Sequence, residues 1–422
     1  MDLTHSPAST RRILLASLVG TGIEFYDFYV YTTAAALVFG ELFFPRSSPA
    51  ASQLLAFATI AVAFVARPLG SVFFGHFGDR IGRKSTLVAS LLTMGLSTTL
   101  VAFLPTYASI GWPAALILCL LRFGQGFGLG GEWGGAALLA VENAPPGWRA
   151  RYGMFPQLGA PLGFVTANGL FLLLGLALTP AQFHDWGWRV PFAVSAALVG
   201  VGMWIRLRLH ETPAFAKVLE EGPPPSVPFA ETIGRHGGAL VIGTLGAIAC
   251  FAVYYIATAF ALGYGVKTLG YSMQAFLGVQ LGAILFMALG IMLSAYAADA
   301  HYDERRVLAA GCVGAIALGF AIQPLMGGGT LALVFVFLSL LLFVMGFVYG
   351  PLGAWIPHLF PARVRYTGAS IAFNVAGVLG GGLTPFAAQW LAAHGGLTEV
   401  GYYLSAMAAI SLLALMTRAA RA

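Results

Sequence analysis

Five ionisable residues lie inside long apolar stretches of this sequence, where charged side chains are rare. They are Glu24, Asp27, Arg67, Arg122 and Glu132. A carboxylate or guanidinium at the centre of a membrane helix costs about 2.5–3.5 kcal/mol even on a lenient insertion scale. Such groups are tolerated when they pair with one another or face a water-filled cavity. The chemistry that they offer is proton transfer and the binding of anions.

Proton transfer is the chemistry suggested by the two carboxylates of the first apolar stretch. Glu24 and Asp27 are three residues apart, so a helix places them on one face. A neighbouring arginine favours an ionised carboxylate, whereas burial favours the protonated form. If Asp27 gains and loses Arg122 during a conformational change, it takes up a proton on one side of the membrane and releases it on the other. We therefore expect proton coupling to involve Asp27, Arg122, Glu132 and Glu24. The alternative is a permanent Asp27–Arg122 or Glu24–Arg67 bridge that only holds helices together.

Anion binding is the chemistry suggested by the arginines. Arg67 and Arg122 are the two cations expected within the membrane, so the carboxylate of an anionic substrate has few other partners. Polar and aromatic residues of other helices are expected to complete the pocket: Tyr31, Gln157, Tyr254, Tyr255, Gln280, Trp355 and Asn374. The alternative for each of them is a hydrogen bond to a neighbouring helix, which is the more frequent role of such residues in membranes.

The composition of the chain indicates where these residues are held. Of the 422 residues, 59% are hydrophobic and 9% are charged, against about 25% charged in a typical soluble domain. This excludes the usual water-soluble enzymes, nucleic-acid binders and disordered scaffolds. Cys119, Cys250 and Cys312 are isolated in separate apolar stretches and form no CxxC pair or Cys/His metal spacing. No cofactor or metal is predicted, and the chain is expected to be an all-α membrane protein.

A spanning helix needs roughly 20 mostly apolar residues, and twelve such stretches are found. The first six are expected near residues 14–40, 53–77, 86–106, 113–139, 152–178 and 188–208. The second six are expected near residues 238–264, 274–297, 306–326, 330–356, 366–391 and 400–418. An even number of spans places both termini on the same side of the membrane.

The basic residues predict which side that is. Of the 22 lysines and arginines, 17 lie in the termini and in the connections on the side of the termini, three lie on the other side, and two lie within helices. Lysine and arginine accumulate on the cytoplasmic side of membrane proteins. The chain is therefore expected to be a multi-pass protein of the cell inner (plasma) membrane, with both termini in the cytoplasm. The first apolar stretch lacks a clear cleavage site, so we expect a retained helix rather than a signal peptide.

One long polar connection divides the chain into two halves. We expect an N-terminal six-helix half at residues 1–209, a cytoplasmic linker at 210–237 and a C-terminal half at 238–422. Charge and proton handling are expected in the first half, because the five buried charges all lie there. The segment Arg149-Ala-Arg-Tyr-Gly is echoed 214 positions later from Arg363 onward. Transporters are often built from such repeats, with the substrate site where the repeats meet; chance similarity of a short basic loop is the alternative.

A loop motif between the second and third stretches reads Gly75-His-Phe-Gly-Asp79-Arg80-Ile-Gly82-Arg83-Lys84. Its glycines permit close packing and turning, and Asp79 can cap a helix N-terminus or pair with an arginine of the other half. We expect a conformational latch made of Gly75, Asp79, Arg80, Gly82, Arg83 and Lys84; the alternative is a basic loop that only sets topology. The corresponding loop of the second half keeps Asp299 but lacks the glycines, so the sequence does not establish a second latch.

That loop resembles the motif of the major facilitator superfamily, and further motifs narrow the resemblance. They are Gly22-Ile-Glu-Phe-Tyr-Asp27, Ala66-Arg-Pro-Leu-Gly70, Leu121-Arg-Phe-Gly-Gln-Gly126, Gly130-Gly-Glu-Trp-Gly-Gly135, Trp186-Gly-Trp-Arg-Val-Pro-Phe192 and Leu359-Phe-Pro-Ala-Arg-Val-Arg365. Along nearly its whole length the chain is similar to the metabolite:proton symporter family of that superfamily. The resemblance implies two pseudo-symmetric halves of six transmembrane helices each.

The resemblance also implies an activity: import of a small organic acid or zwitterion together with protons, by alternating access. The expected partners are this substrate, protons and the lipid bilayer, with no nucleic acid, and the chain is expected to be a monomer. The segment Gly159-Ala-Pro-Leu-Gly163 partly matches a motif of proton-coupled antiporters, so a proton-coupled exporter is the alternative. A membrane-embedded enzyme is not predicted, because no nucleophile, base or metal cluster is found at depth.

Overall fold

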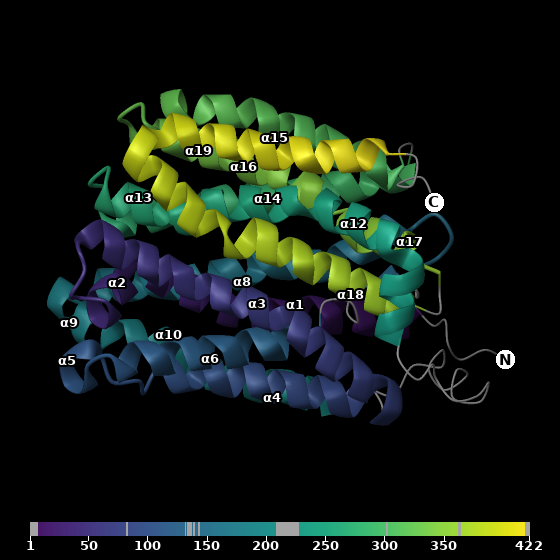
Figure 1. Cartoon of the computed structure of the whole chain (residues 1–422), viewed down its shortest axis with the longest axis horizontal. Helices are drawn as coiled ribbons and strands as arrows, with labels where there is room; N and C mark the ends of the chain where they lie inside the picture. The colour runs from purple at the N-terminus through teal and green to yellow at the C-terminus, as the bar shows by residue number, and fades with distance from the viewer. Residues whose placement is uncertain are drawn as a thin grey trace.

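The computed structural model describes residues 7–81, 83–130, 132, 137, 140–141, 144–207, 228–300, 303–361 and 364–417. All the regular secondary structure within these ranges is helical, and the helices are joined by turns and irregular segments. The long helices run roughly side by side, in one group built from the first half of the chain and a second group built from the second half (Figure 1). We call these groups the first and second lobes.

The first lobe begins with α1 (Pro7–Ala34), which continues through the π-helical turn η2 (Ala35–Phe39) into α2 (Gly40–Phe43). The long helices that follow are α3 (Pro49–Ile81), α4 (Arg83–Val101), α6 (Pro113–Leu129), α8 (Arg149–Ala177) and α10 (Val190–Leu207). Three short helices lie in the connections: α5 (Tyr107–Ile110), α9 (Pro180–Asp185) and η3 (Gly187–Arg189).

The second lobe repeats this plan. Its first helix, α12 (Pro228–Tyr255), also passes through a π-helical turn, η4 (Ile256–Phe260), into a short helix, α13 (Ala261–Lys267). The helices that follow are α14 (Met273–Ala300), α15 (Glu304–Met326), α16 (Leu331–Tyr349), α17 (Leu352–His358), α18 (Arg365–Ala376), η5 (Gly377–Gly382) and α19 (Thr384–Met416). A break at Gly396, whose φ is 79°, divides α19 into two segments.

The described chain has twelve long helical segments, which we call rods. In this count each π-helical turn is joined to its neighbours, α17 is joined to α16, and α19 is divided at Gly396. They match the twelve stretches expected from the sequence, with α3 longer than expected; the expected stretch 113–139 extends beyond α6 into residues that are only partly described. By length and apolar composition, seven segments of the described chain suffice to cross a membrane, and Val88–Val101 and Pro113–Leu129 are shorter apolar helices.

Glycines allow two helices of the first lobe to touch backbone to backbone. A Cβ atom at Gly70 of α3 would overlap the carbonyl oxygen of Phe127 in α6, and one at Gly126 of α6 would overlap that of Ala63 in α3. Small residues at such positions let membrane helices approach closely. This contact holds α3 and α6 at a fixed distance, and with them the two intramembrane arginines that they carry.

The two ends of the molecule are distinguished by their short helices (Figure 1). At one end α12 begins, α17 lies and α19 ends; we call it the terminal face. At the other end lie α2, α5, α9 and α13; we call it the opposite face. The seam between the two lobes runs from one face to the other.

Candidate functional site: a cavity between the lobes

A cavity lies between the two lobes. Its empty space, including the part open to solvent, is about 720 Å³. Both lobes contribute to its walls: Thr21, Glu24, Phe25, Phe28, Tyr29, Arg67, Leu129 and Ala160 come from the first, and Cys250, Phe251, Tyr254, Tyr255, Met287, Met345, Tyr349, Phe373 and Asn374 come from the second.

Aromatic rings join the lobes across this cavity. Tyr29 of α1 stacks on Tyr254 of α12, with ring centroids 5.4 Å apart. Phe28 meets Tyr255 edge to face at 6.2 Å. Offset stacked and edge-to-face pairs of this kind are favourable beyond the area that they bury. The walls are therefore largely apolar and aromatic, and only a few polar groups are available to orient a ligand.

Arg67 is the cation of this cavity. Its side chain is 6% exposed, and its guanidinium carbon lies 4.6 Å from the centroid of the Phe28 ring and 4.4 Å from that of Phe64. Its Nε is buried without a hydrogen-bond partner, and no carboxylate within the described ranges forms an ion pair with it. A buried cation in this state favours an anionic ligand, because burying an unpaired charge is costly. Glu24 lines the same cavity, so an acidic and a basic residue both contribute to its wall.

Asp27 and Arg122 lie outside the cavity wall, in a polar network inside the first lobe. Both are fully buried, yet they do not form an ion pair with each other. Gln125 connects them instead: its Oε1 accepts a hydrogen bond from Nη1 of Arg122, and its Nε2 donates to the backbone oxygen of Asp27 at 2.8 Å. Ser195 of α10 donates to Oδ1 of Asp27. The ring of Phe28 connects this network with the cavity, because it contacts the guanidinium groups of both Arg122 and Arg67.

Several atoms of this network have no partner within the described ranges. They are Oδ2 of Asp27 and both Nε and Nη2 of Arg122. A buried polar atom without a hydrogen bond destabilises the state in which it is found. The network therefore has unused hydrogen-bonding capacity on its acidic and its basic member, which is the property required of a group that changes partners.

The other predicted residues divide into two sets. Tyr254, Tyr255, Asn374 and Glu24 line the cavity together with Arg67. The remaining ones are buried in contacts between helices. Tyr31 donates to Thr59, Gln280 to the carbonyls of η4, and Gln157 to Tyr349, while Trp355 packs against Gly246 and Glu132 accepts from Ser90.

Sequence reasoning missed two parts of the site. The first is Gln125, although its spacing of three residues from Arg122 places both side chains on one helix face. The second is the aromatic wall formed by Phe25, Phe28 and Tyr29 on one face of α1. Their i, i+3, i+4 spacing was the available signal, but it is shared by every buried helix face in an apolar chain.

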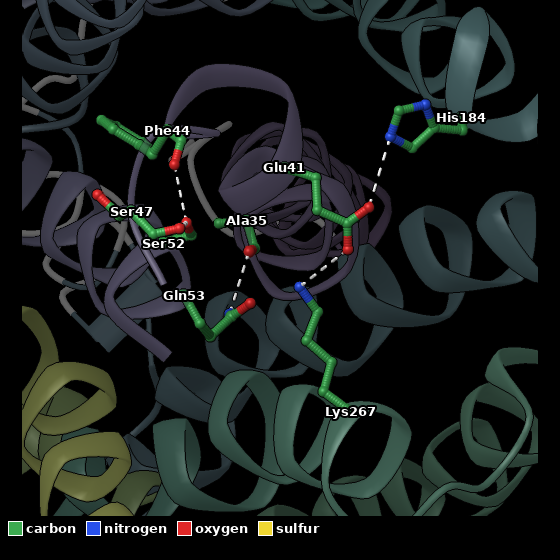
Figure 2. Close-up of polar contacts among 8 residues, drawn as sticks. All are labelled: Ala35, Glu41, Phe44, Ser47, Ser52, Gln53, His184 and Lys267. Atoms are coloured by element: carbon green, nitrogen blue, oxygen red, sulfur yellow. Dashed lines mark hydrogen bonds and ion pairs between the residues drawn. The ribbon is translucent and has the colours of Figure 1, made fainter. Parts of the chain in front are cut away.

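Polar contacts cross the seam at the opposite face (Figure 2). The carboxylate of Glu41, at the end of the first rod, lies 3.9 Å from Nζ of Lys267 in the second lobe and 3.6 Å from Nε2 of His184 in the first. Close by, Nε2 of Gln53 donates to the backbone oxygen of Ala35 in η2 at 3.3 Å. Gln274 of α14 donates to the backbone oxygen of Gly175 in α8 at 2.8 Å. None of these contacts was expected.

Polar contacts also cross the seam at the terminal face. Asp299, at the end of α14, accepts hydrogen bonds from the backbone N–H groups of Ala150 and Arg151 at 3.0 and 2.8 Å. Nη1 of Arg149 lies 2.6 Å from Nε2 of His358 in α17. The side chains of the predicted latch residues are not among those that the structure describes, and for Gly82 the same holds of the backbone. These residues are Gly75, Asp79, Arg80, Gly82, Arg83 and Lys84. Asp299 of the second half makes the contact that was expected of Asp79.

Two helical lobes around a central cavity form the architecture from which many membrane transporters are built. The sequence model of the Major Facilitator Superfamily matches residues 17–385, and the chain belongs to this superfamily of secondary transporters, which are multi-pass membrane proteins. Within the described ranges no group of three His, Cys, Asp or Glu side chains is arranged to hold a metal ion.

Relatives with similar sequences are metabolite transporters. The chain is 49% identical over 417 residues to the inner membrane metabolite transport protein YhjE of Escherichia coli (strain K12). The alignment covers 98% of this chain and 95% of that protein. It is 38% identical to the shikimate transporter of the same strain, over 97% and 94% of the two chains. It is 32% identical to the proline/betaine transporter of Salmonella typhimurium (strain LT2), over 96% and 82%.

Solved structures confirm the fold. The crystal structure of a D-xylose-proton symporter superimposes with a TM-score of 0.72 at 18% identity, covering 96% of this chain and 97% of the other. A partially occluded, inward-open structure of the xylose transporter XylE from E. coli gives a TM-score of 0.74 at 16% identity, with 96% of each chain covered. The expected all-α fold with two six-helix halves is thereby confirmed.

Proposed function

We propose that this transporter imports a small organic acid or zwitterion together with protons by alternating access. The observation that carries the proposal is Arg67, a buried guanidinium in the cavity between the lobes that forms no ion pair with any carboxylate of the described residues. A substrate carboxylate would satisfy it, and a bidentate arginine–carboxylate pair is among the stronger polar contacts in proteins. Glu24 and the aromatic wall leave room for a cationic or apolar group at the other end of the substrate.

Proton coupling is assigned to the Asp27 network. Burial favours the protonated carboxyl, whereas an approaching cation favours the ionised one. In the present conformation Gln125 stands between Arg122 and Asp27. Oδ2 of Asp27 has no partner among the described residues, and a movement of α6 relative to α1 that brings Arg122 onto it would release the proton. The same side chains thus serve as a switch without any further ionisable group, and Glu132 and Glu24 are secondary candidates.

The sequence relationships and the basic residues support the proposed location of transport. One relative is named an inner membrane transport protein, and the basic residues favour a cytoplasmic terminal face. Residues 1–209 and 238–422 would then rock as two bodies about the cavity. A proton-motive force of about 150 mV supplies roughly 3.5 kcal/mol per charge moved, which is sufficient for accumulation of a few hundred-fold.

The test is uptake into vesicles of defined orientation, with labelled shikimate, proline and glycine betaine as separate probes. A symporter takes up its substrate faster when the outside is acidic, and a protonophore abolishes accumulation. Arg67→Ala should abolish uptake of the accepted probe, and Arg46→Ala is the control because Arg46 lies outside the cavity, over the Tyr107 ring. Wild-type uptake by the Arg67→Ala variant would overturn the assignment of the anion site.

The same assay distinguishes import from export. A proton-coupled exporter of the same fold exchanges substrate for protons, so an acidic exterior opposes substrate entry and drives its exit. Inhibition of entry by external acid, with stimulation of efflux, would replace import by export while leaving the anion site at Arg67 in place.

A further inference from the structure

Two hydrogen bonds between the lobes are related by the internal repeat of the fold. In the first, Nε2 of Gln157 in α8 donates to the backbone oxygen of Tyr349 at the end of α16, at 3.1 Å. In the second, Nδ2 of Asn374 in α18 donates to the backbone oxygen of Gly130, just after the end of α6, at 3.3 Å. In each case the fifth rod of one lobe supplies a side-chain amide, and the end of the fourth rod of the other lobe supplies a main-chain carbonyl.

The Asn374 bond is part of a larger contact. The same Nδ2 donates to Oγ of Ser71 in α3 at 2.8 Å and to the backbone oxygen of Ser370 at 2.9 Å. Because the amide nitrogen has two hydrogens, the longer contact with Gly130 shares one of them in a three-centre bond. Ser71 in turn donates to the backbone oxygen of Gly130. One asparagine of the second lobe therefore holds both α3 and α6 of the first, the two helices that carry Arg67 and Arg122.

Both bonds lie at the end of the cavity that is nearer to the terminal face. Gln157 is eight residues from the start of α8 and Asn374 is nine from the start of α18, which places each about 12–14 Å inward along its helix. Ala160, the residue of α8 that lines the cavity, lies about one turn beyond Gln157. Tyr349 and Asn374 line the cavity themselves. The bonds thus separate the cavity from the outer contacts of Asp299 and Arg149.

The acceptors are backbone groups at interruptions of their helices. After Tyr349 the chain passes through Gly350 and Pro351 before α17 begins at Leu352, and α6 ends at Leu129. A main-chain acceptor at a helix end accepts a hydrogen bond from any suitable donor that approaches it. Such a contact can be made and broken without repacking a side chain, which suits a surface that must open and close.

We propose that these two bonds, which we call the amide lock, are the contact that holds the cavity closed toward the terminal face. Asn374 and Gln157 are positioning residues, because they determine toward which face the cavity is open. Because Asn374 also lines the cavity, a bound substrate that competes for its amide weakens the lock, so occupancy favours opening toward the terminal face. The proposal depends on the alternating-access part of the proposed function, but on neither proton coupling nor the identity of the substrate.

The test measures access to the cavity from each face. Cys250 lines the cavity and serves as the reporter, in a background with Cys119→Ser and Cys312→Ser, which removes the other two cysteines. A membrane-impermeant thiol reagent is applied to vesicles of both orientations, and an accessible C-terminal tag identifies the vesicles that expose the terminal face. A Cys250→Ala variant controls for unspecific labelling.

Removal of both amides, in Gln157→Ala with Asn374→Ala, should accelerate Cys250 labelling from the terminal face about tenfold and leave labelling from the opposite face unchanged or slower. The matched control is Gln274→Ala. Gln274 also donates a side-chain amide across the seam to a main-chain carbonyl, that of Gly175, but at the opposite face. Its removal should accelerate labelling from the opposite face instead.

Single substitutions cover the case in which the double variant does not fold. Each should give a smaller acceleration from the terminal face alone. Ser370→Ala should have no effect, because Ser370 offers Asn374 only its backbone oxygen. Labelling rates that are unchanged in both single variants, or that rise equally from both faces, would overturn the amide lock. Neither result bears on Arg67, since the labelling needs no substrate and no proton gradient.

Discussion

The carboxylate of Asp299 in the second lobe caps the helix that begins at Arg149 in the first, accepting the backbone N–H of Arg151 at 2.8 Å and lying 3.6 Å from its Nε. The residue in the N-cap position of this helix, Trp148, makes no side-chain hydrogen bond to it. Helix N-termini leave backbone donors unsatisfied, and a carboxylate there also meets the positive end of the helix dipole. The start of α8 is thus capped by the other lobe, and opening of the terminal face, as proposed above, would remove this cap.

Asp299→Ala should therefore favour opening of the terminal face. An N-cap contributes about 1 kcal/mol, so the labelling of Cys250 from that face should rise about fivefold. Asp303→Ala is the matched control, because Asp303 caps α15 within its own lobe through the N–H of Arg305. If both substitutions change labelling alike, the cap of α8 contributes to stability only and not to the balance between conformations.

Asp27→Asn should separate transport from proton coupling. Asparagine keeps a side-chain oxygen that can accept from Ser195, but it cannot exchange a proton. The variant should lose accumulation driven by a pH gradient and keep exchange of labelled for unlabelled substrate. Ser195→Ala, which removes the partner and leaves the carboxyl in place, should accumulate substrate with a shifted pH dependence. Normal accumulation by the Asp27→Asn variant would exclude Asp27 as the coupling group.

Much of this architecture could be predicted from the sequence, because hydropathy is summed over about 20 residues for each span. The same reasoning singled out Arg67, Glu24, Tyr254, Tyr255 and Asn374, which line the cavity, since polar groups deep in apolar helices usually face the interior of a bundle. Their roles in substrate binding and proton coupling stay predictions. The depth of a residue is read from its position in the helix, whereas its partner depends on how neighbouring helices are rotated and shifted. That is why the amide of Gln125 between Arg122 and Asp27 was not foreseen.

Contacts between the lobes were the part that sequence reasoning could not supply. Glu41 and Lys267 belong to different lobes and lie at the ends of rods that are well separated in the chain. No local spacing rule relates them. Asp299 was discounted because its loop lacks the glycines of the first motif, but capping requires only a carboxylate at the right place. The expected latch around Asp79 and the expected boundary of the linker stay predictions.

Reversal of the Glu41–Lys267 pair tests closure at the opposite face. Glu41→Lys and Lys267→Glu each place like charges across the seam and should accelerate labelling of Cys250 from that face, while the double reversal should restore the original rate. Glu41 is largely exposed, so the effect should be small, a few-fold at low salt and less at high salt. His184→Gln removes the contact within the first lobe and should have the weaker effect. Failure of the double reversal to restore the rate would contradict a direct role of the pair.

Gly70→Ala should disturb the contact on which the site depends. The added methyl group overlaps the carbonyl oxygen of Phe127, so α3 and α6 must move apart or the variant must lose stability, at a cost of about 1–3 kcal/mol for overpacking. Gly169→Ala is the matched control, because no atom lies within 4 Å of its Cβ position in α8. We expect Gly70→Ala to lower the melting temperature in detergent and to reduce uptake, since Arg67 and Arg122 are carried by the two displaced helices. An unchanged melting temperature with full uptake would show that the two helices can separate without consequence, and that the arginines need no fixed spacing.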